Sequence, residues 1–486
     1  MRVNLLNKDS FYDPKELDEF KKNLIKDLEL NDIIKAACGF DSFLLDLFPK
    51  VLLEPLKTKE EILYRESIYK DLEANSDILK SLYEYLKEIL SDMRVKYPYL
   101  LNDKSPYTVV SSSSSLIEFL VPRLISVRAS ISNLKDLKSE GMNLFKDENL
   151  KSLNQDNLNH MLEIAECLSN KKGLMALISL DGNMQFKDSD ILKSTFVSKD
   201  YKKRWKKAEE IEYGYLSETI SNEINMKNDS ISLNVSYNLG MAVFHMISFL
   251  KDLYFEIGFY LCAYNLSLKI KSLNLPLTFP EISDSFNYDG LYDMAVGFKK
   301  NGEVVGNKHN TKANIWVITG ANQGGKTTFL RSLGQSYLLM QAGLFVNANS
   351  LSLPIISGLY THFDKEEDTK LESGKFDDEL RRFDILLNKI DKDSLVILNE
   401  SFQSTDEYDG SKIGFEIISA LLDSNIKVIL VTHMYDLAML IKDKYKDAYF
   451  LRAEREESGE RSFKIVENEP LRTSFARDLY DKIWNE

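Results

Sequence analysis

The sequence predicts an α+β multidomain protein, in which a mostly helical N-terminal region is followed by an α/β domain with a mostly parallel sheet. Three observations lead to this class. Apolar residues recur at helical spacing over residues 1–275, strand and helix patterns alternate from about residue 276 to 450, and a chain of 486 residues is too long for a single core. We expect two domains, over residues 1–275 and 276–486, and a short helical segment at the end of the second.

The composition excludes several classes of protein. Hydrophobic residues make up 44% of the chain and aromatic residues 11%, which is enough for packed cores and excludes a disordered or fibrous protein. The net charge of −13 repels nucleic acid and anionic lipid on average, so any contact with DNA must be local. Polar and charged residues interrupt every long apolar stretch, so we expect no signal peptide, no membrane partner and a cytoplasmic protein. The cysteines are far apart in sequence and are expected to be buried, reduced thiols: Cys38, Cys167 and Cys262.

Helical periodicity dominates the first domain. Thr58 and Glu61 form a predicted capping box at the start of one helix. The serine run 111–115 predicts a loop. Further helices are predicted over 116–168, 203–224 and 241–273. Short apolar stretches around Asp181-Gly182-Asn183 predict a β hairpin, within an insert at about 168–211.

The second domain follows Pro276 and Pro280 and carries the most informative segment of the chain. Residues 320–327 fit the pattern G-x-x-x-x-G-K-[ST], between a predicted buried strand at 315–318 and a predicted helix at 328–342. In such a P-loop, backbone N–H groups turn toward the phosphates of a nucleotide, the lysine adds positive charge and the hydroxyl binds Mg²⁺. We expect contacts to ATP from Gly320, Ala321, Asn322, Gln323, Gly324, Gly325, Lys326, Thr327 and Thr328.

Two further predicted strands end in polar residues at the same edge of the sheet. One apolar run ends in Asn399 and Glu400, and another leads into His433. Glu400 is placed to orient and deprotonate an attacking water, and His433 to reach the γ-phosphate or that water. A P-loop hydrolase normally has Asp before this glutamate, where it helps to hold Mg²⁺. Because Asn399 is neutral, we expect Thr327 and Asn399 to form a weaker Mg²⁺ site and ATP hydrolysis to be weakened.

Taken together, these elements resemble the ATPase domain of the MutS family, the DNA mismatch repair ATPases. The matching segments follow the family's order and spacing: TGANQGGKTTFLR (319–331), LVILNE (395–400), YDG (408–410) and VTHMYDL (431–437). The resemblance implies an ABC-like P-loop NTPase fold, with Asn322 near the γ-phosphate, Glu400 as the catalytic carboxylate and His433 as a switch histidine. It also implies that residues 408–410 lie in a loop that faces a partner subunit.

Residues 372–379 are similar to the family's signature segment and keep its F-x-x-E element as Phe376 and Glu379. In the family, a serine of this segment crosses a dimer interface to the other subunit's ATP. Here Ser373 lies one position early and Gly374 takes the expected place. The resemblance therefore implies a trans contact either from Ser373 or from backbone amides at Gly374, with Asp409 on the same dimer surface.

The resemblance extends upstream, through residues 51–90 and 253–276, to the family's core helical domain with its levers and clamp. Because this core begins so early, we expect a short, divergent MutS-like protein without the family's mismatch-reading and connector domains. The corresponding insert holds the most basic stretch of the chain, with Tyr201 and Trp205 interleaved. DNA contacts are expected from Lys202, Lys203, Arg204 and Lys206, although such a run is also typical of a solvated helix face.

These features predict a homodimeric, DNA-binding ATPase that uses ATP and Mg²⁺ to close helical arms around DNA, in mismatch repair or in recognition of DNA structure. One alternative stays open: an ATP-gated scaffold with little hydrolysis, acting on a protein or ribonucleoprotein partner. Asn399 and the negative net charge both favour it. Another ABC-related ATPase, such as a transporter or SMC-type subunit, fits less well because no LSGGQ-like segment is present.

Overall fold

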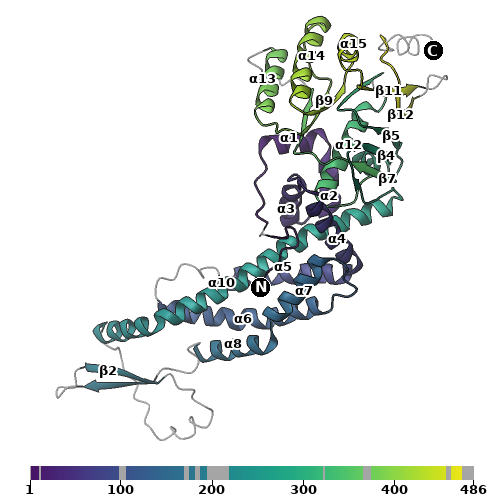
Figure 1. The fold of residues 1–486 in the computed structure, drawn as a ribbon. Helices are drawn as coiled ribbons and strands as arrows, with labels where there is room; N and C mark the ends of the chain where they lie inside the picture. Colours follow the sequence, from purple (N-terminus) through teal and green to yellow (C-terminus); the bar gives the residue numbers. More distant parts are fainter. Residues whose placement is uncertain are drawn as a thin grey trace. The chain divides into compact units, whose positions relative to one another are not determined.

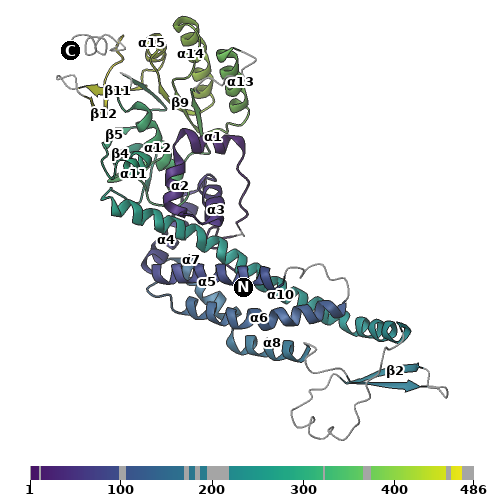
Figure 2. The same ribbon diagram turned by 180° about the vertical axis from the view of Figure 1, so that it is seen from behind.

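The computed structural model describes residues 2–9, 12–97, 106–168, 175–180, 186–193, 218–320, 323–364, 374–455 and 461–472. Contacts divide the chain into two compact units. Unit 1 comprises Met1–Asn4 and Asn75–Ile257, and unit 2 comprises Leu5–Ala74 and Gly258–Glu486. Figures 1 and 2 show the elements of both units. The predicted domain boundary at residue 275 stays a prediction, and unit 2 extends across it.

Unit 1 consists of long helices and a hairpin. Its elements are α5 (Ser76–Lys96), α6 (Pro106–Ser132), α7 (Glu140–Ser152), α8 (Gln155–Leu168), β1 (Met175–Leu180), β2 (Phe186–Lys193) and the first part of α10 (Glu218–Ser272). β1 and β2 pair antiparallel, which confirms the predicted hairpin, while its turn and residues 203–217 lie outside the described residues. Tyr83 of α5 stacks on Tyr254 of α10 with ring centroids 5.0 Å apart, so the two helices share a core.

The serine run 111–115 was predicted as a loop, and that prediction is wrong: the run lies inside α6. Ser112 Oγ donates to Val109 O at 3.3 Å, one turn back, and Ser113 and Ser114 are buried. Short hydroxyl side chains can bond the preceding turn of their own helix, so a serine run does not have to end it.

The N-terminal part of unit 2 is helical. It holds α1 (Glu19–Asp27), α2 (Leu30–Cys38), α3 (Ser42–Leu52) and α4 (Lys59–Ala74). The predicted capping box is confirmed at the start of α4, since Glu61 N donates to Thr58 Oγ1 at 3.2 Å and Thr58 N donates to Glu61 Oε2 at 3.0 Å. Cys38 and Cys262 are buried free thiols, as expected, with their Sγ atoms 3.6 Å apart, while the side chain of Cys167 lies outside the part that the structure describes.

The predicted α/β domain contains a six-stranded sheet in the order β12-β11-β6-β10-β9-β8. The strands are β6 (Ile315–Thr319), β8 (Leu359–Phe363), β9 (Leu395–Asn399), β10 (Lys427–Val431), β11 (Tyr449–Arg455) and β12 (Arg461–Glu467). All pairs are parallel except β11 with β12, which confirms a mostly parallel sheet. β6, β9 and β10 are continuous apolar runs because parallel strands are buried on both faces.

Helices and a second sheet cover this sheet. The helices are α12 (Lys326–Gln341), α13 (Lys375–Leu387), α14 (Glu407–Asp423) and α15 (Tyr435–Lys444). On one face, alternate strand residues such as Val317 and Leu398 form a core with α13, α14 and α15. Trp316, on the opposite face of β6, contacts Phe286 and Tyr288 of the second sheet.

The second sheet has the order β3-β7-β4-β5 and was not predicted. It comprises β3 (Glu281–Ile282), β4 (Phe286–Leu291), β5 (Asn307–Thr311) and β7 (Ser350–Leu353), with α11 (Met294–Lys299) between β4 and β5. Its strands come from segments before and after α12 in the sequence, so no local sequence pattern could predict the sheet. None of the helices among the described residues is long and apolar enough to cross a membrane.

Candidate functional site

The segment between β6 and α12 turns on glycines. Gly320 has φ +116° and Gly325, the residue before α12, has φ +91°. A Cβ at Gly320 would lie 3.0 Å from Ala453 N, and one at Gly325 would lie 3.0 Å from Phe463 O. Both positions therefore need glycine for conformation and for space. Ala321 and Asn322 lie outside the described residues, and Gln323 follows them with φ +59°.

Lys326 begins α12 and is only 4% exposed. Its Nζ donates to Gly320 O at 2.7 Å and lies 3.5 Å from His433 Nε2. Burial lowers the pKa of Lys326 to about 8, although the charge of Glu400 acts in the opposite direction. The site thus holds a cation that its surroundings do not fully stabilise, which is typical of a lysine that meets an anionic ligand.

Asn399 and Glu400 follow β9 at the carboxyl edge of the sheet. Thr327 Oγ1 donates to Asn399 Oδ1 at 3.2 Å, so the two predicted metal ligands are in contact. Glu400 Oε1 lies 2.9 Å from Nε2 of His433, which follows β10. The hydrogen bond from His433 lowers the pKa of Glu400, so Glu400 is a carboxylate at neutral pH. Because a carboxylate only accepts, Nε2 of His433 carries the proton that is shared with it.

Lys326, Thr327 and Glu400 line a cavity of about 1060 Å³, which we call the Lys326 cavity. Its lining includes the predicted residues Gly324, Lys326, Thr327 and Glu400. It also includes residues that were not predicted from the sequence: Tyr292, Asp293, Val296, Lys300, Val304, Val305, Asn307 and Phe463. They come from α11 and the residues that flank it, from the loop before β5 and the first residue of β5, and from β12. Only the tertiary fold brings them beside the glycine-rich segment.

The residues of the Lys326 cavity fit a nucleoside triphosphate with Mg²⁺. Gly324 and Gly325 stand directly before α12, where the backbone N–H groups of a helix start can face phosphate oxygens, and Lys326 supplies a positive charge beside them. Thr327 Oγ1 and Asn399 Oδ1 are the oxygen ligands that Mg²⁺ prefers. The apolar side chains Val305 and Phe463 of the same lining suit the face of a base.

The remaining predicted residues lie on α13, on α14 or in undescribed segments. Gly374 precedes α13 and is exposed, and Asp409 is exposed on α14. Ser373 is outside the described residues, as are the predicted DNA contacts Lys202, Lys203, Arg204 and Lys206. Tyr408–Gly410 was predicted in a loop but forms the first turn of α14, because Asp406 Oδ1 accepts from Tyr408 N at 3.0 Å and from Asp409 N at 3.2 Å and so starts the helix.

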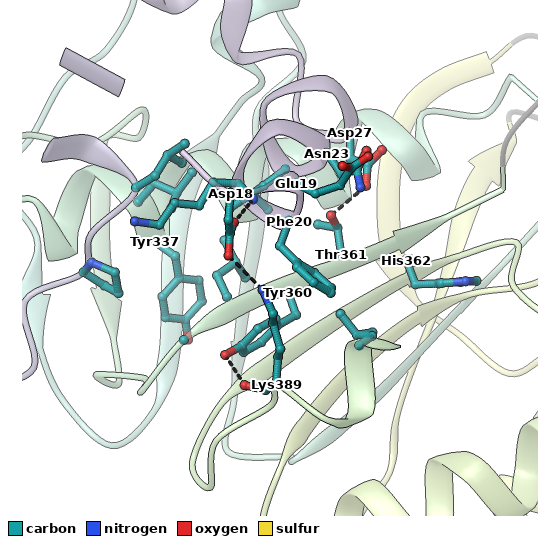
Figure 3. A pocket seen from close by; sticks show the side chains of 18 of the residues that line it. Asp18, Glu19, Phe20, Asn23, Asp27, Tyr337, Tyr360, Thr361, His362 and Lys389 are labelled. Atoms are coloured by element: carbon teal, nitrogen blue, oxygen red, sulfur yellow. Dashed lines mark hydrogen bonds and ion pairs between the residues drawn. The ribbon is translucent and has the colours of Figure 1, made fainter. Parts of the chain in front are cut away.

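Unit 2 contains a second cavity, of about 610 Å³, between α1, α12, β8 and α13. We call it the α1 cavity, and Figure 3 shows its lining. Lys389 Nζ pairs with Asp18 Oδ2 at 3.0 Å, and Thr361 Oγ1 donates to Asp27 Oδ2 at 2.6 Å. The backbone carbonyl of Lys389 also accepts the hydroxyl of Tyr360 at 2.8 Å. These bonds tie α1 to β8 and to the end of α13.

Two family models match the chain. Residues 316–476 match MutS domain V, and residues 57–273 match the MutS2 N-terminal domain. The first range contains the six-stranded sheet and the predicted residues of the Lys326 cavity. The second contains most of the helices of unit 1.

Several curated proteins are similar over part of the chain. The DNA mismatch repair protein MutS of Thermus aquaticus is 32% identical over 157 residues, which are 32% of this chain and 19% of that protein. The DNA mismatch repair protein MutS of Aquifex pyrophilus is 28% identical over 205 residues, which are 41% of this chain and 24% of that protein. The matches thus cover a quarter or less of the length of these relatives. The two family models and these relatives together show that the chain belongs to the MutS family.

Proposed function

We propose that the chain binds ATP and Mg²⁺ in the Lys326 cavity, hydrolyses the ATP, and uses the cycle to act on DNA as a homodimer. One observation carries the proposal. The glycine-rich segment, Asn399, Glu400 and His433 follow three parallel strands. Three contacts join their side chains: Lys326 Nζ lies 3.5 Å from His433 Nε2, Thr327 Oγ1 lies 3.2 Å from Asn399 Oδ1, and His433 Nε2 lies 2.9 Å from Glu400 Oε1. Ligand sites of parallel sheets form at this carboxyl edge.

Each residue has a role that its position supports. Backbone N–H groups around Gly324 and Gly325 and the Lys326 ammonium bind the phosphates. Bound Mg²⁺ would neutralise phosphate charge, held through Thr327 and Asn399. Glu400 orients the attacking water and accepts its proton. His433, which shares a proton with Glu400, holds that carboxylate toward the phosphates.

A second candidate function is an ATP-gated scaffold that hydrolyses little ATP. Two properties of this chain favour it. Asn399 offers a neutral oxygen where a carboxylate would attract Mg²⁺ more strongly. The lowered pKa of Glu400 also makes it a weaker base than an unperturbed glutamate. Both properties reduce the rate of hydrolysis without preventing ATP from binding.

The dimer and the DNA contacts extend the proposal beyond the Lys326 cavity. Gly374, exposed at the start of α13, has no side chain to cap the helix, so the first backbone N–H groups of α13 would be available to face the triphosphate of a second copy. Ser373 remains the alternative donor. Binding of ATP would then bring two copies together, and the helices of unit 1 would respond by closing on DNA, through the basic stretch at Lys202–Lys206.

Turnover measured with and without DNA separates the two candidate functions. We expect ATP hydrolysis by the wild type that duplex or branched DNA increases at low salt, and that Glu400→Gln abolishes. Asn399→Asp should raise the rate. Turnover that no DNA changes would contradict the DNA-acting ATPase, and tight ATP binding with no turnover in either the wild type or Asn399→Asp would favour the scaffold.

A further inference from the structure

The loop that follows β9 has an unusual backbone. Glu400 has φ +56° and Phe402 has φ +68°, so two non-glycine residues out of three adopt the left-handed conformation. This conformation is unfavourable for residues with a Cβ and persists only where the surrounding structure enforces it. The direction of the Glu400 side chain depends on this backbone. The contacts that hold this backbone conformation therefore also determine the direction of the Glu400 carboxylate.

Glu379 of α13 supplies one of the enforcing contacts. Phe402 N donates to Glu379 Oε1 at 2.6 Å, a short bond to an ionisable acceptor. Glu379 is only 1% exposed, and its other oxygen, Oε2, has no hydrogen-bond partner among the described residues. A buried carboxylate with one partner stabilises a fold poorly, since an apolar side chain of similar volume would serve as well or better. Its presence needs a reason other than stability.

Other contacts fix the same loop on its remaining sides. Glu400 N donates to Val431 O at 2.9 Å, and Ser401 Oγ donates to His362 O at 3.0 Å. In Figure 3 the ring of His362 points away from Phe20 and Lys389 of the α1 cavity. His362 Nδ1 lies 2.8 Å from Ser401 Oγ. β10 and β8 therefore hold residues 400 and 401, whereas residue 402 is held by α13.

The side chain of Phe402 ties the loop to α13 and α14 as well. Its ring lies 5.3 Å from that of Phe383 on α13. A Cβ at Gly410 of α14 would lie only 2.4 Å from Phe402 O, and one at Gly414 would lie 3.0 Å from the Phe402 ring. Gly410 is the glycine of the Tyr408–Gly410 motif, so this motif serves the close packing of α14 on the loop.

We propose that Glu379 is a positioning residue that couples α13 to the catalytic carboxylate Glu400. The proposal rests on the proposed ATPase function. Glu379 touches neither nucleotide nor reacting atoms. It fixes the Phe402 N–H, and through two peptide units the backbone of Glu400. A movement of α13, at whose start Gly374 would meet the nucleotide of a second copy, is transmitted along the helix to the loop that aims Glu400 in the chain's own cavity.

The test uses the full chain with Glu379→Ala, Glu379→Gln and, as a matched control, Asp384→Asn on the exposed side of the same helix. The first measurement is hydrogen exchange at the Phe402 amide without nucleotide. The second is the affinity for a non-hydrolysable ATP analogue, and the third is kcat with ATP and Mg²⁺. Melting temperatures verify that each variant is folded.

For Glu379→Ala we expect exchange at the Phe402 amide about 10-fold faster or more, since the amide loses its partner. We expect kcat about 10- to 100-fold lower, because displacing a catalytic group from its productive position slows a reaction by about that factor. The affinity for the analogue should stay within about 2-fold, because the phosphate loop is unchanged. Glu379→Gln keeps an acceptor oxygen for the Phe402 N–H, so kcat should fall only about 2- to 5-fold. Asp384→Asn should change none of the three. If Glu379→Ala does not fold, the test is Glu379→Gln: a kcat about 2- to 5-fold lower at unchanged analogue affinity supports the positioning role, and an unchanged kcat contradicts it.

The outcomes separate this proposal from the function on which it rests. Wild-type turnover that Glu379→Ala leaves within 2-fold would overturn the positioning role and leave the ATPase intact. Unchanged exchange at the Phe402 amide in Glu379→Ala would overturn it equally, because the bond would then not hold the loop. Absence of turnover in the wild type would refute the ATPase function and the positioning role together, whatever the exchange result.

Discussion

The two cavities of unit 2 both contain charged side chains, but they differ in how these charges are paired. In the α1 cavity, Lys389 faces the carboxylate of Asp18 at 3.0 Å. In the Lys326 cavity, the Lys326 ammonium lies against a backbone carbonyl and a histidine, and burial lowers its pKa to about 8. A half-exposed ion pair such as Asp18–Lys389 is typical of a protein surface, whereas a buried lysine whose pKa is lowered by desolvation is suited to an anionic ligand. The comparison supports the proposed nucleotide site in the Lys326 cavity and a structural role for the α1 cavity.

The largest expected effect is on turnover when Glu400 loses its charge. Glu400→Gln should lower kcat about 100-fold or more, because a general base contributes at least that much, and should leave ATP binding intact. Asp18→Asn removes a carboxylate from the α1 cavity and should leave kcat within about 2-fold. Steady-state phosphate release measures both. Comparable losses in the two variants would remove the distinction between the cavities.

The next largest effect is on nucleotide affinity when Lys326 is replaced. Lys326→Met should weaken ADP and ATP binding about 10- to 100-fold, as expected for the loss of a hydrogen bond to a charged group. It should also raise the melting temperature of the nucleotide-free protein, because a poorly solvated ammonium is removed. Lys389→Met in the α1 cavity is the matched control and should leave the affinity unchanged. Isothermal calorimetry and thermal melts measure these changes, and an undiminished affinity in Lys326→Met would count against the proposal.

The pKa of Lys326 predicts a pH dependence. Phosphate binding needs the ammonium, so ADP affinity should fall by up to about 10-fold per pH unit above pH 8, with proton uptake on binding. The stability of the nucleotide-free protein should move in the opposite direction. Between pH 8 and the unfolded-state pKa of 10.5, the unfolded chain holds a proton that the folded chain has lost, so this lysine contributes increasing stability as pH rises.

Calorimetry of ADP binding at pH 7 and pH 9, in buffers of different ionisation enthalpy, measures the proton uptake. Lys326→Met should abolish it. A proton uptake that persists in the variant would mean that another group titrates on binding.

A smaller effect is expected at Asn399. Asn399→Asp places a charge beside Thr327 and should lower the Mg²⁺ concentration for half-maximal turnover about 3- to 10-fold, in line with a single added charge in a partly solvated site. Titration of turnover with Mg²⁺ at fixed ATP measures this. A higher Mg²⁺ requirement in the variant would show that Asn399 is not near the metal.

The smallest effect is expected in the α1 cavity itself. Thr361→Val removes the hydrogen bond to Asp27 and should lower the free energy of unfolding by about 1 kcal/mol. Nucleotide affinity and kcat should stay within about 2-fold. Urea unfolding measures the free energy of unfolding, and calorimetry measures the nucleotide affinity. A large change in affinity would show that the α1 cavity is coupled to the Lys326 cavity.

Local sequence predicted the parts of the molecule that depend on local physics. Residues 320–327 predict a phosphate-binding loop because the spacing of their glycines and lysine is specific to such loops. The apolar runs before Asn399 and His433 predict buried parallel strands. The capping box at Thr58 and Glu61 depends only on residues three apart, and the structure confirms it.

Contacts between segments that are distant in the chain could not be predicted from the sequence. The bond from Phe402 N to Glu379 joins residues of a loop and a helix, and the lining residues Val305 and Phe463 join the loop before β5 to strand β12. The second sheet draws its strands from both sides of α12. The serine run in α6 was wrongly predicted as a loop because serine is compatible with a loop and with a helix, and only packing decides between them.

Both proposals require that a triphosphate occupies the Lys326 cavity. The most direct measurement is a crystal structure of the full chain with Mg²⁺ and a non-hydrolysable ATP analogue. We expect phosphates within hydrogen-bond distance of Lys326 Nζ, Mg²⁺ next to Thr327 Oγ1 and Asn399 Oδ1, and the base against Val305 and Phe463. Phosphates bound elsewhere on the chain, or a cavity without the analogue at saturating concentration, would contradict the account.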